Sequence, residues 1–110
     1  MKGVQLRIYT YEGRRHGGLP LYEWLLERAK KQGIPGGSAF RAIAGFGRHG
    51  RLHEQAFFEL AGEEPVLVEF IAGDDQAEAF LQLLGAELPE LFVVRVPVEY
   101  GCAGDAAAQG

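Results

Sequence analysis

The order of strand-like and helix-like periodicity along this 110-residue chain constrains its fold more than any other feature. From Val4 to Thr10, apolar residues alternate with polar ones, which is the period of a half-buried strand. SAFRAIAGF (Ser38 to Phe46), VLVEFIA (Val66 to Ala72) and LFVVRVPVEY (Leu91 to Tyr100) are three further strand candidates. A segment with helical spacing follows the first and the third of these four strands.

The two helical segments carry recognisable start and stop signals. We expect the first from about Leu19 to Gln32, because Pro20 suits a first helical turn and Gly33 supplies a C-terminal stop. Asp74 and Asp75 are placed to cap the second helix. The expected apolar stripes are Leu21, Trp24, Leu25 and Ala29 in the first helix, and Ala77, Phe80, Leu81 and Leu84 in the second.

The resulting order is β-α-β, a long loop, and β-α-β. This matches an α+β, ferredoxin-like split β-α-β fold (βαββαβ), in which two helices cover one face of an antiparallel sheet. We expect one such domain over residues 1–101 and a flexible C-terminal tail over 102–110, which contains the sole cysteine, Cys102. EGRRHGG (Glu12 to Gly18) is interpreted as a polar turn, and Pro97 favours an edge position for the last strand.

The last two strands of this sheet are apolar on both faces. Two helices can cover only one of these faces, so the other would expose a large apolar surface to water. The sequence therefore predicts an oligomer that buries it. The residues concerned are Val66, Val68 and Phe70 against Leu67 and Ile71, and Phe92, Val94 and Val96 against Val93.

Composition and charge exclude several classes of function. A net charge of -4 argues against nucleic-acid binding, which needs a basic surface. No apolar run approaches the roughly 18 residues of a membrane span, so we expect a cytoplasmic protein without direct membrane insertion. Ser38 and Thr10 are the only hydroxyl residues besides the tyrosines. Because catalysis needs a rigidly held nucleophile or acid–base pair, we expect no enzyme and no required cofactor.

GFGRHGRLHE (Gly45 to Glu54) concentrates more potential chemistry than any other stretch. Its glycines would let backbone N–H groups approach an anion, and Arg48 and Arg51 could clamp phosphate oxygens. The same glycines could instead simply permit a bend out of the preceding strand. A G-x-G that does not open a helix is neither a Rossmann nor a Walker signature.

Two alternative functions remain open for this stretch. The first is a metal-responsive trimer similar to the CutA-type proteins, with His49, His53 and Glu54 as ligands, although Gly50 argues against a regular helix between the histidines. The second is an enzyme that acts on a phosphorylated metabolite.

GFGRHG followed by VLVEFIAGDDQAEAF resembles the nitrogen-regulatory PII proteins. In those proteins a GFGR-type segment opens a long regulatory loop, and a later strand leads into a DDQ-type helix start. The segments LRIYTYE, GLPLYEWLLERAKKQGIPGGSAFRAIAGFG and RLHE are similar to a PII-like branch known as domain of unknown function 190. The resemblance spans residues 4 to 100.

This resemblance implies a homotrimer that binds a small anionic ligand, typically an adenine nucleotide, in clefts between subunits. Binding would order the 45–60 loop, which would then dock on or release a target protein such as a membrane transporter or an enzyme. The implied ligand-binding residues are Gly45, Phe46, Gly47, Arg48 and Glu69, with Arg51 and His53 as secondary candidates.

The chain also departs from the PII pattern. PII proteins carry a glycine- and lysine-rich phosphate loop before the last strand, whereas this chain has LLGAELPELF, with Glu87 and Glu90 and no lysine. Residues 45 to 65 contain no Tyr, Ser or Thr that could be modified. The resemblance therefore implies a sensor with the same architecture and a different or weaker ligand.

Overall fold

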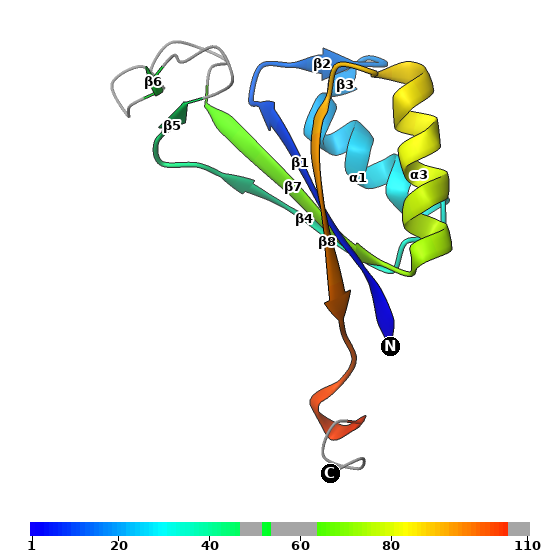
Figure 1. The fold of residues 1–110 in the computed structure, drawn as a ribbon. Coiled ribbons are helices and arrows are strands. Elements are labelled where there is room, and N and C mark those ends of the chain that lie inside the picture. The colour runs from blue at the N-terminus through cyan, green and yellow to red at the C-terminus, as the bar shows by residue number, and fades with distance from the viewer. Residues whose placement is uncertain (47–51, 54–63, 106–110) are drawn as a thin grey trace.

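The computed structural model describes residues 1–46, 52–53 and 64–105. Over these residues the chain forms a four-stranded antiparallel sheet with two helices on one of its faces (Figure 1). The strand order is β4-β7-β1-β8, which confirms the ferredoxin-like split β-α-β arrangement. The elements are β1 (Lys2–Tyr11), α1 (Leu21–Lys31), β4 (Gly36–Arg41), β7 (Pro65–Ala72), α3 (Asp74–Glu87) and β8 (Phe92–Glu99).

Two short hairpins, each a separate two-stranded sheet, lie near one end of the four-stranded sheet (Figure 1). β2 (Arg15–His16) pairs with β3 (Leu19–Pro20), so the segment expected to be only a polar turn is a hairpin. β5 (Gly45–Phe46) pairs with β6 (Leu52–His53). Because Leu19 and Pro20 belong to β3, the first helix begins two residues later than predicted, with Pro20 as its extended N-terminal flank.

The second strand of the sheet is shorter than SAFRAIAGF predicts. Arg41 is the last residue of β4 and pairs with Val66, next to the first residue of β7. Ala42 then donates its backbone N–H to the carbonyl of Pro65 (2.9 Å), after which β7 offers no further partner. The chain therefore bends away from the sheet before it reaches β5.

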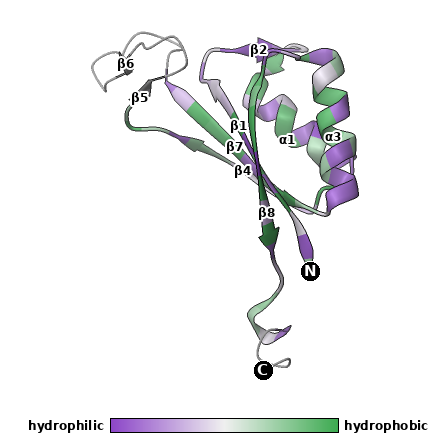
Figure 2. Cartoon of the chain, viewed as in Figure 1, coloured by the Kyte–Doolittle hydropathy of each residue, from purple (hydrophilic) through white to green (hydrophobic). Residues whose placement is uncertain are grey.

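The hydrophobic core lies between the sheet and the two helices. β1 occupies an interior position of the sheet, and Val4, Leu6 and Ile8 point from it into the core. Every residue predicted for the two apolar helix stripes is buried there, except Leu81, which is partly buried against the core. Figure 2 shows that apolar residues also run along β7 and β8. Pro97 lies on the edge strand β8, as predicted.

Gln76 joins the start of the second helix to the end of the first. Its Oε1 accepts a hydrogen bond from the backbone N–H of Gly73 (3.1 Å), and its Nε2 donates to the carbonyl of Gly33 (2.9 Å). The cap of α3 is thus formed by Gly73 and Gln76 and not by the aspartates, which lie within the first turn. There Asp74 and Asp75 still interact favourably with the helix dipole.

After β8, two hydrogen bonds join Cys102 and Asp105. The N–H of Cys102 donates to Oδ2 of Asp105 (3.2 Å), and the N–H of Asp105 donates to the carbonyl of Cys102 (3.0 Å). The flexibility expected of residues 102–110 stays a prediction. Within the described ranges, no helix has the length and apolar character needed to cross a bilayer.

Two adjacent glycines of β4 provide a matched test of the packing. A Cβ on Gly37 would come within 2.5 Å of the ring of Phe70, which is 2% exposed, whereas a Cβ on Gly36 would meet nothing within 4 Å. We expect Gly37→Ala to lower the free energy of unfolding by about 1–3 kcal/mol, because the buried ring must shift. Gly36→Ala should change it by less than about 0.5 kcal/mol. Urea unfolding of both variants at one protein concentration measures the difference, and equal effects would contradict this packing.

Candidate functional site

The face of the sheet that points away from the helices is rich in apolar side chains. The strand register places Phe40, Leu67, Tyr9 and Phe92 in one row across all four strands. The rings of Tyr9 and Phe92 lie 5.8 Å apart between centroids. The exposed fractions of Tyr9, Phe40 and Phe92 are 42%, 51% and 45%. The structure thus has the uncovered apolar face that the sequence predicts, and the sheet is antiparallel throughout.

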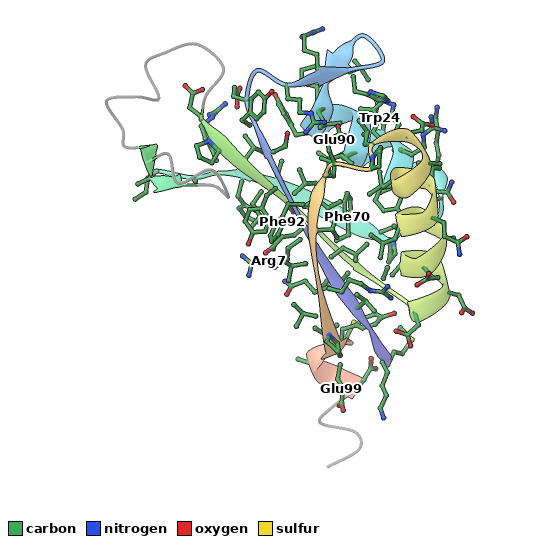
Figure 3. All side chains as sticks on the ribbon, turned by 45° about the horizontal axis from the view of Figure 1, so that its top comes forward. Arg7, Trp24, Phe70, Glu90, Phe92 and Glu99 are labelled. Carbon is green, nitrogen blue, oxygen red and sulfur yellow. The ribbon has the colours of Figure 1, made fainter. Side chains whose placement is uncertain are left out.

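An ion pair lies in the next row of this open face. Arg7 pairs with Glu69 in the register, and its Nε lies 3.3 Å from Oε1 of Glu69. The geometry is that of an ion pair without a hydrogen bond, since this Nε has no hydrogen-bond partner in the described part of the chain. Figure 3 shows Arg7 projecting from the side of the sheet opposite α1 and α3. Glu69, one of the predicted ligand-binding residues, is therefore partly buried on the open face.

The hairpin formed by β5 and β6 brings three predicted site residues together. Gly45 pairs with His53, and Phe46 lies next to Gly45 in β5. The predicted residues Gly47, Arg48 and Arg51 lie outside the described residues. His49 and Glu54, the other metal-ligand candidates, also lie outside them. Among the residues that the structure describes, no group of three or more His, Cys, Asp or Glu side chains could hold a metal ion.

The residues on either side of the 45–60 segment are its stems. Backbone hydrogen bonds join both stems to the rest of the domain at one end of the sheet. Ala42, before the segment, bonds to Pro65, after it. The backbone N–H of Glu12, which follows β1, donates to the carbonyl of Glu64 (2.8 Å). The end of β1 and both stems therefore meet at the same end of the sheet.

A shallow hollow of about 160 Å³ opens beside this junction. Arg41 and Glu12 form a two-pronged pair at its rim, in which Nε donates to Oε2 (3.2 Å) and Nη2 donates to Oε1 (2.8 Å). These bonds to the Glu12 carboxylate raise the pKa of the Arg41 guanidinium. The lining residues are Glu12, Tyr22, Ala39, Phe40, Arg41 and Val66. No sequence motif indicates this hollow, because its residues come from four separate segments.

The segment that replaces a lysine-rich phosphate loop holds carboxylates that are already paired. Glu90 accepts a hydrogen bond from Arg14. Oε2 of Glu87 lies 3.1 Å from Nε2 of His16, and its Oε1 lies 3.8 Å from Nη2 of Arg28. The basic residues of the β2 hairpin, for which a solvated turn was expected, therefore bind their own chain. Both acidic residues that set this segment apart from PII proteins serve to fasten the hairpin to the helix end.

Trp24 packs against His16 and Arg28 of this cluster. The His16 ring meets the Trp24 ring edge-on at 4.6 Å between centroids, and the guanidinium of Arg28 lies 5.1 Å from the Trp24 ring centre. Since Trp24 is only 8% exposed, these contacts cover an aromatic core residue with the imidazole of His16 and the guanidinium of Arg28. The hairpin is thus held by packing as well as by charge.

Two PII-like proteins are among those whose solved structures are similar to this chain. A protein from Thermus thermophilus that is described as PII-like matches with a TM-score of 0.62 at 20% identity, covering 96% of this chain and 94% of the other. CPII from Thiomonas intermedia K12, in a structure bound to ADP and bicarbonate, matches with a TM-score of 0.57 at 17% identity over 91% of each chain. The fold of this chain is therefore that of the PII-like proteins, as the sequence resemblance implied.

Sequence comparison then places the chain within one branch of that class. The model of the DUF190 family, described as Uncharacterized ACR, matches residues 3–100. A UPF0166 protein of Aquifex aeolicus (strain VF5) is 42% identical over 82 residues, covering 74% of this chain and 78% of the relative. UPF0166 protein MJ1524 of Methanocaldococcus jannaschii is 31% identical over 71 residues, covering 64% and 65%. The protein belongs to the DUF190 family, which confirms the branch named from its motifs.

The Glu90 pairing predicts how stability depends on pH. The backbone N–H of Glu90 and the Arg14 guanidinium lower the pKa of this carboxyl from its ordinary value of 4.5. A carboxyl with a lowered folded-state pKa stabilises the fold above about pH 4.5 and loses this effect as the pH falls through the lowered value. We therefore expect Glu90→Gln to be less stable than the parent at pH 7, and we expect this difference to shrink as the pH falls below 4.5.

Urea midpoints of the parent and the variant at several pH values measure this effect. Glu23→Gln, at an exposed glutamate in the first turn of α1, is the matched control for loss of one carboxylate. A stability difference for Glu90→Gln that stays constant from pH 7 to pH 3 would contradict the role assigned to this pair.

Proposed function

We propose that this protein is a homotrimeric PII-like signalling protein that binds a small anionic ligand, an adenine nucleotide, in clefts between its subunits. The observation that carries the proposal is the uncovered apolar face of a PII-like sheet, in a chain that keeps the GFGR segment at the start of its long loop. Nucleotide-bound CPII structures, one with ADP and one with ADP and AMP, share the fold and support this ligand class.

The trimer accounts for the chemistry of the open face. Full burial of one large apolar side chain contributes about 1.5–3 kcal/mol, and Tyr9, Phe40 and Phe92 are each about half-exposed. Together with Leu67 they form one row. A trimer that covers this row in each of its three copies removes a continuous apolar strip from water. The Arg7–Glu69 pair gives the same face one charge of each sign, so two copies of the face need not repel each other.

The ligand site is proposed at the loop base. Gly45 and Gly47 would offer backbone N–H groups to an anion, and Arg48, with Arg51 as a second cation, would neutralise its charge. Phe46, His53 and Glu69 complete the proposed set from β5, β6 and β7. We propose a regulatory role in the cytoplasm without enzymatic activity, because neither the motif nor the described residues provide a nucleophile held beside a base.

The output of the sensor is proposed to be the 45–60 segment. Its two stems meet the end of β1 at the bonds from Ala42 to Pro65 and from Glu12 to Glu64. A ligand at the loop base would therefore act on the point where this segment joins the domain. The target is proposed to be another protein, either a membrane transporter or an enzyme, whose surface the segment contacts.

A calorimetric titration of AMP, ADP, ATP and cyclic nucleotides into the purified protein tests the ligand class. We expect binding of at least one adenine nucleotide, and we expect Arg48→Ala to weaken it about tenfold or more, because it removes a charge-assisted hydrogen bond to phosphate. Arg95→Ala is the matched control, since Arg95 pairs with Glu78 on the helix side (3.2 Å). No heat from any nucleotide would refute the proposal.

A further inference from the structure

We propose that Arg41 is an anion-binding residue of the ligand site, and that the Glu12 carboxylate occupies its guanidinium until the ligand's phosphate or carboxylate replaces it. This inference rests on the function proposed above and adds to it a subsite and a built-in competitor. It concerns only described residues: the pair itself and the hollow that it borders.

Two hydrogen bonds join Arg41 and Glu12. Both oxygens of Glu12 accept hydrogen bonds from Arg41, one from Nε and one from Nη2. A phosphate presents two oxygens to the same guanidinium fork with the same geometry, whereas a lysine would offer only a point charge. Glu12 therefore stands where a phosphate or carboxylate of a ligand would bind.

The Arg41 side chain is accessible to solvent. Its side chain is 63% exposed, so an anion from solution can reach it. A surface ion pair contributes little to stability, so a ligand with a higher charge can displace the carboxylate. Glu64 also acts on Arg41 through its charge. An anionic group that binds Arg41 must therefore compete with two carboxylates.

The size and lining of the hollow define the ligand class. Its volume of about 160 Å³ is well below the roughly 300–1,000 Å³ of pockets for whole ligands, so it accommodates an anionic group and not a complete nucleotide. Phe40 and Tyr22 line the hollow beside Arg41, and Phe40 is half-exposed. A ligand with a phosphate and a flat ring could place the phosphate on Arg41 and the ring against Tyr22, because the ring of Phe40 belongs to the row that the trimer is proposed to bury.

The position of Glu12 links this subsite to the rest of the molecule. Its side chain holds Arg41 at the end of β4, and its backbone N–H holds Glu64 before β7. A ligand that takes Arg41 from Glu12 would remove one of the ties between the end of β1 and the stems of the 45–60 segment. Anion binding and the position of these stems would thus be coupled through Glu12.

Opposite effects of two substitutions test this inference. In calorimetric titrations with ADP and with inorganic phosphate, we expect Glu12→Gln to tighten binding about two- to fivefold, because it removes the competitor. Arg41→Gln should weaken binding about tenfold, and Arg41→Lys should weaken it less, because it keeps the charge and loses the fork. Glu78→Gln, which breaks the exposed Arg95–Glu78 pair, should leave the affinity unchanged.

The outcomes separate this inference from the proposed function. Nucleotide binding by the parent that is unchanged in Arg41→Gln, or weakened in Glu12→Gln, would overturn the subsite and leave the sensor in place. No binding by the parent would overturn both. If Arg41→Gln fails to fold, as judged by its thermal unfolding, the sign of the Glu12→Gln effect decides.

Discussion

The organisation of this domain depends on one constraint: two helices can cover only one face of a sheet whose strands are apolar on both. The helix face is a complete core, with β1 held between β7 and β8 and its inward residues, such as Leu6 and Ile8, fully buried. The opposite face carries a row of apolar side chains across all four strands, in which three strands contribute half-exposed rings and β7 contributes Leu67. A protein with this surface has a reason to assemble, and assembly is what would create clefts between subunits.

The proposed chemistry gathers at one end of this sheet. There β1 ends, β4 gives way to β5, and the chain returns into β7, so that backbone bonds from Glu12 and Ala42 fix all three segments together. The exposed Arg41 guanidinium lies at the same junction. The segment before β8 has a different character, since Glu87 and Glu90 are used internally to hold the β2–β3 hairpin. The loop base therefore offers a more favourable site for an anion than the segment before β8.

Periodicity was sufficient to predict most of the fold. The strand and helix order and the buried stripes follow from patterns of two and 3.6 residues, which local sequence records directly. The edge position of Pro97 follows from its missing backbone N–H. The β2–β3 hairpin and the early end of β4 were missed, because they depend on pairing: Leu19 with His16, and Arg41 with the start of β7. The Gly73 cap was also missed, since Gln76 forms it through contacts at both helix ends.

The candidate site was predictable only in part, for the same reason. GFGR stands out locally, and the structure brings Gly45 and His53 together, whereas the roles given to the seven predicted residues remain proposals. The Glu12–Arg41 pair joins residues that no motif connects, and neither residue is unusual within its own segment. Pairs of this kind become visible only when the register of the sheet is known.

Native mass spectrometry of the protein with and without ADP tests the central claim most directly, which is that the open face is buried between three copies. The account predicts a species of three chains that takes up as many as three ADP molecules. It also predicts that Leu67→Glu, in the middle of the apolar row, gives single chains, while Gln82→Glu on the exposed side of α3 does not. A parent protein that remains a single chain at micromolar concentration would contradict the account.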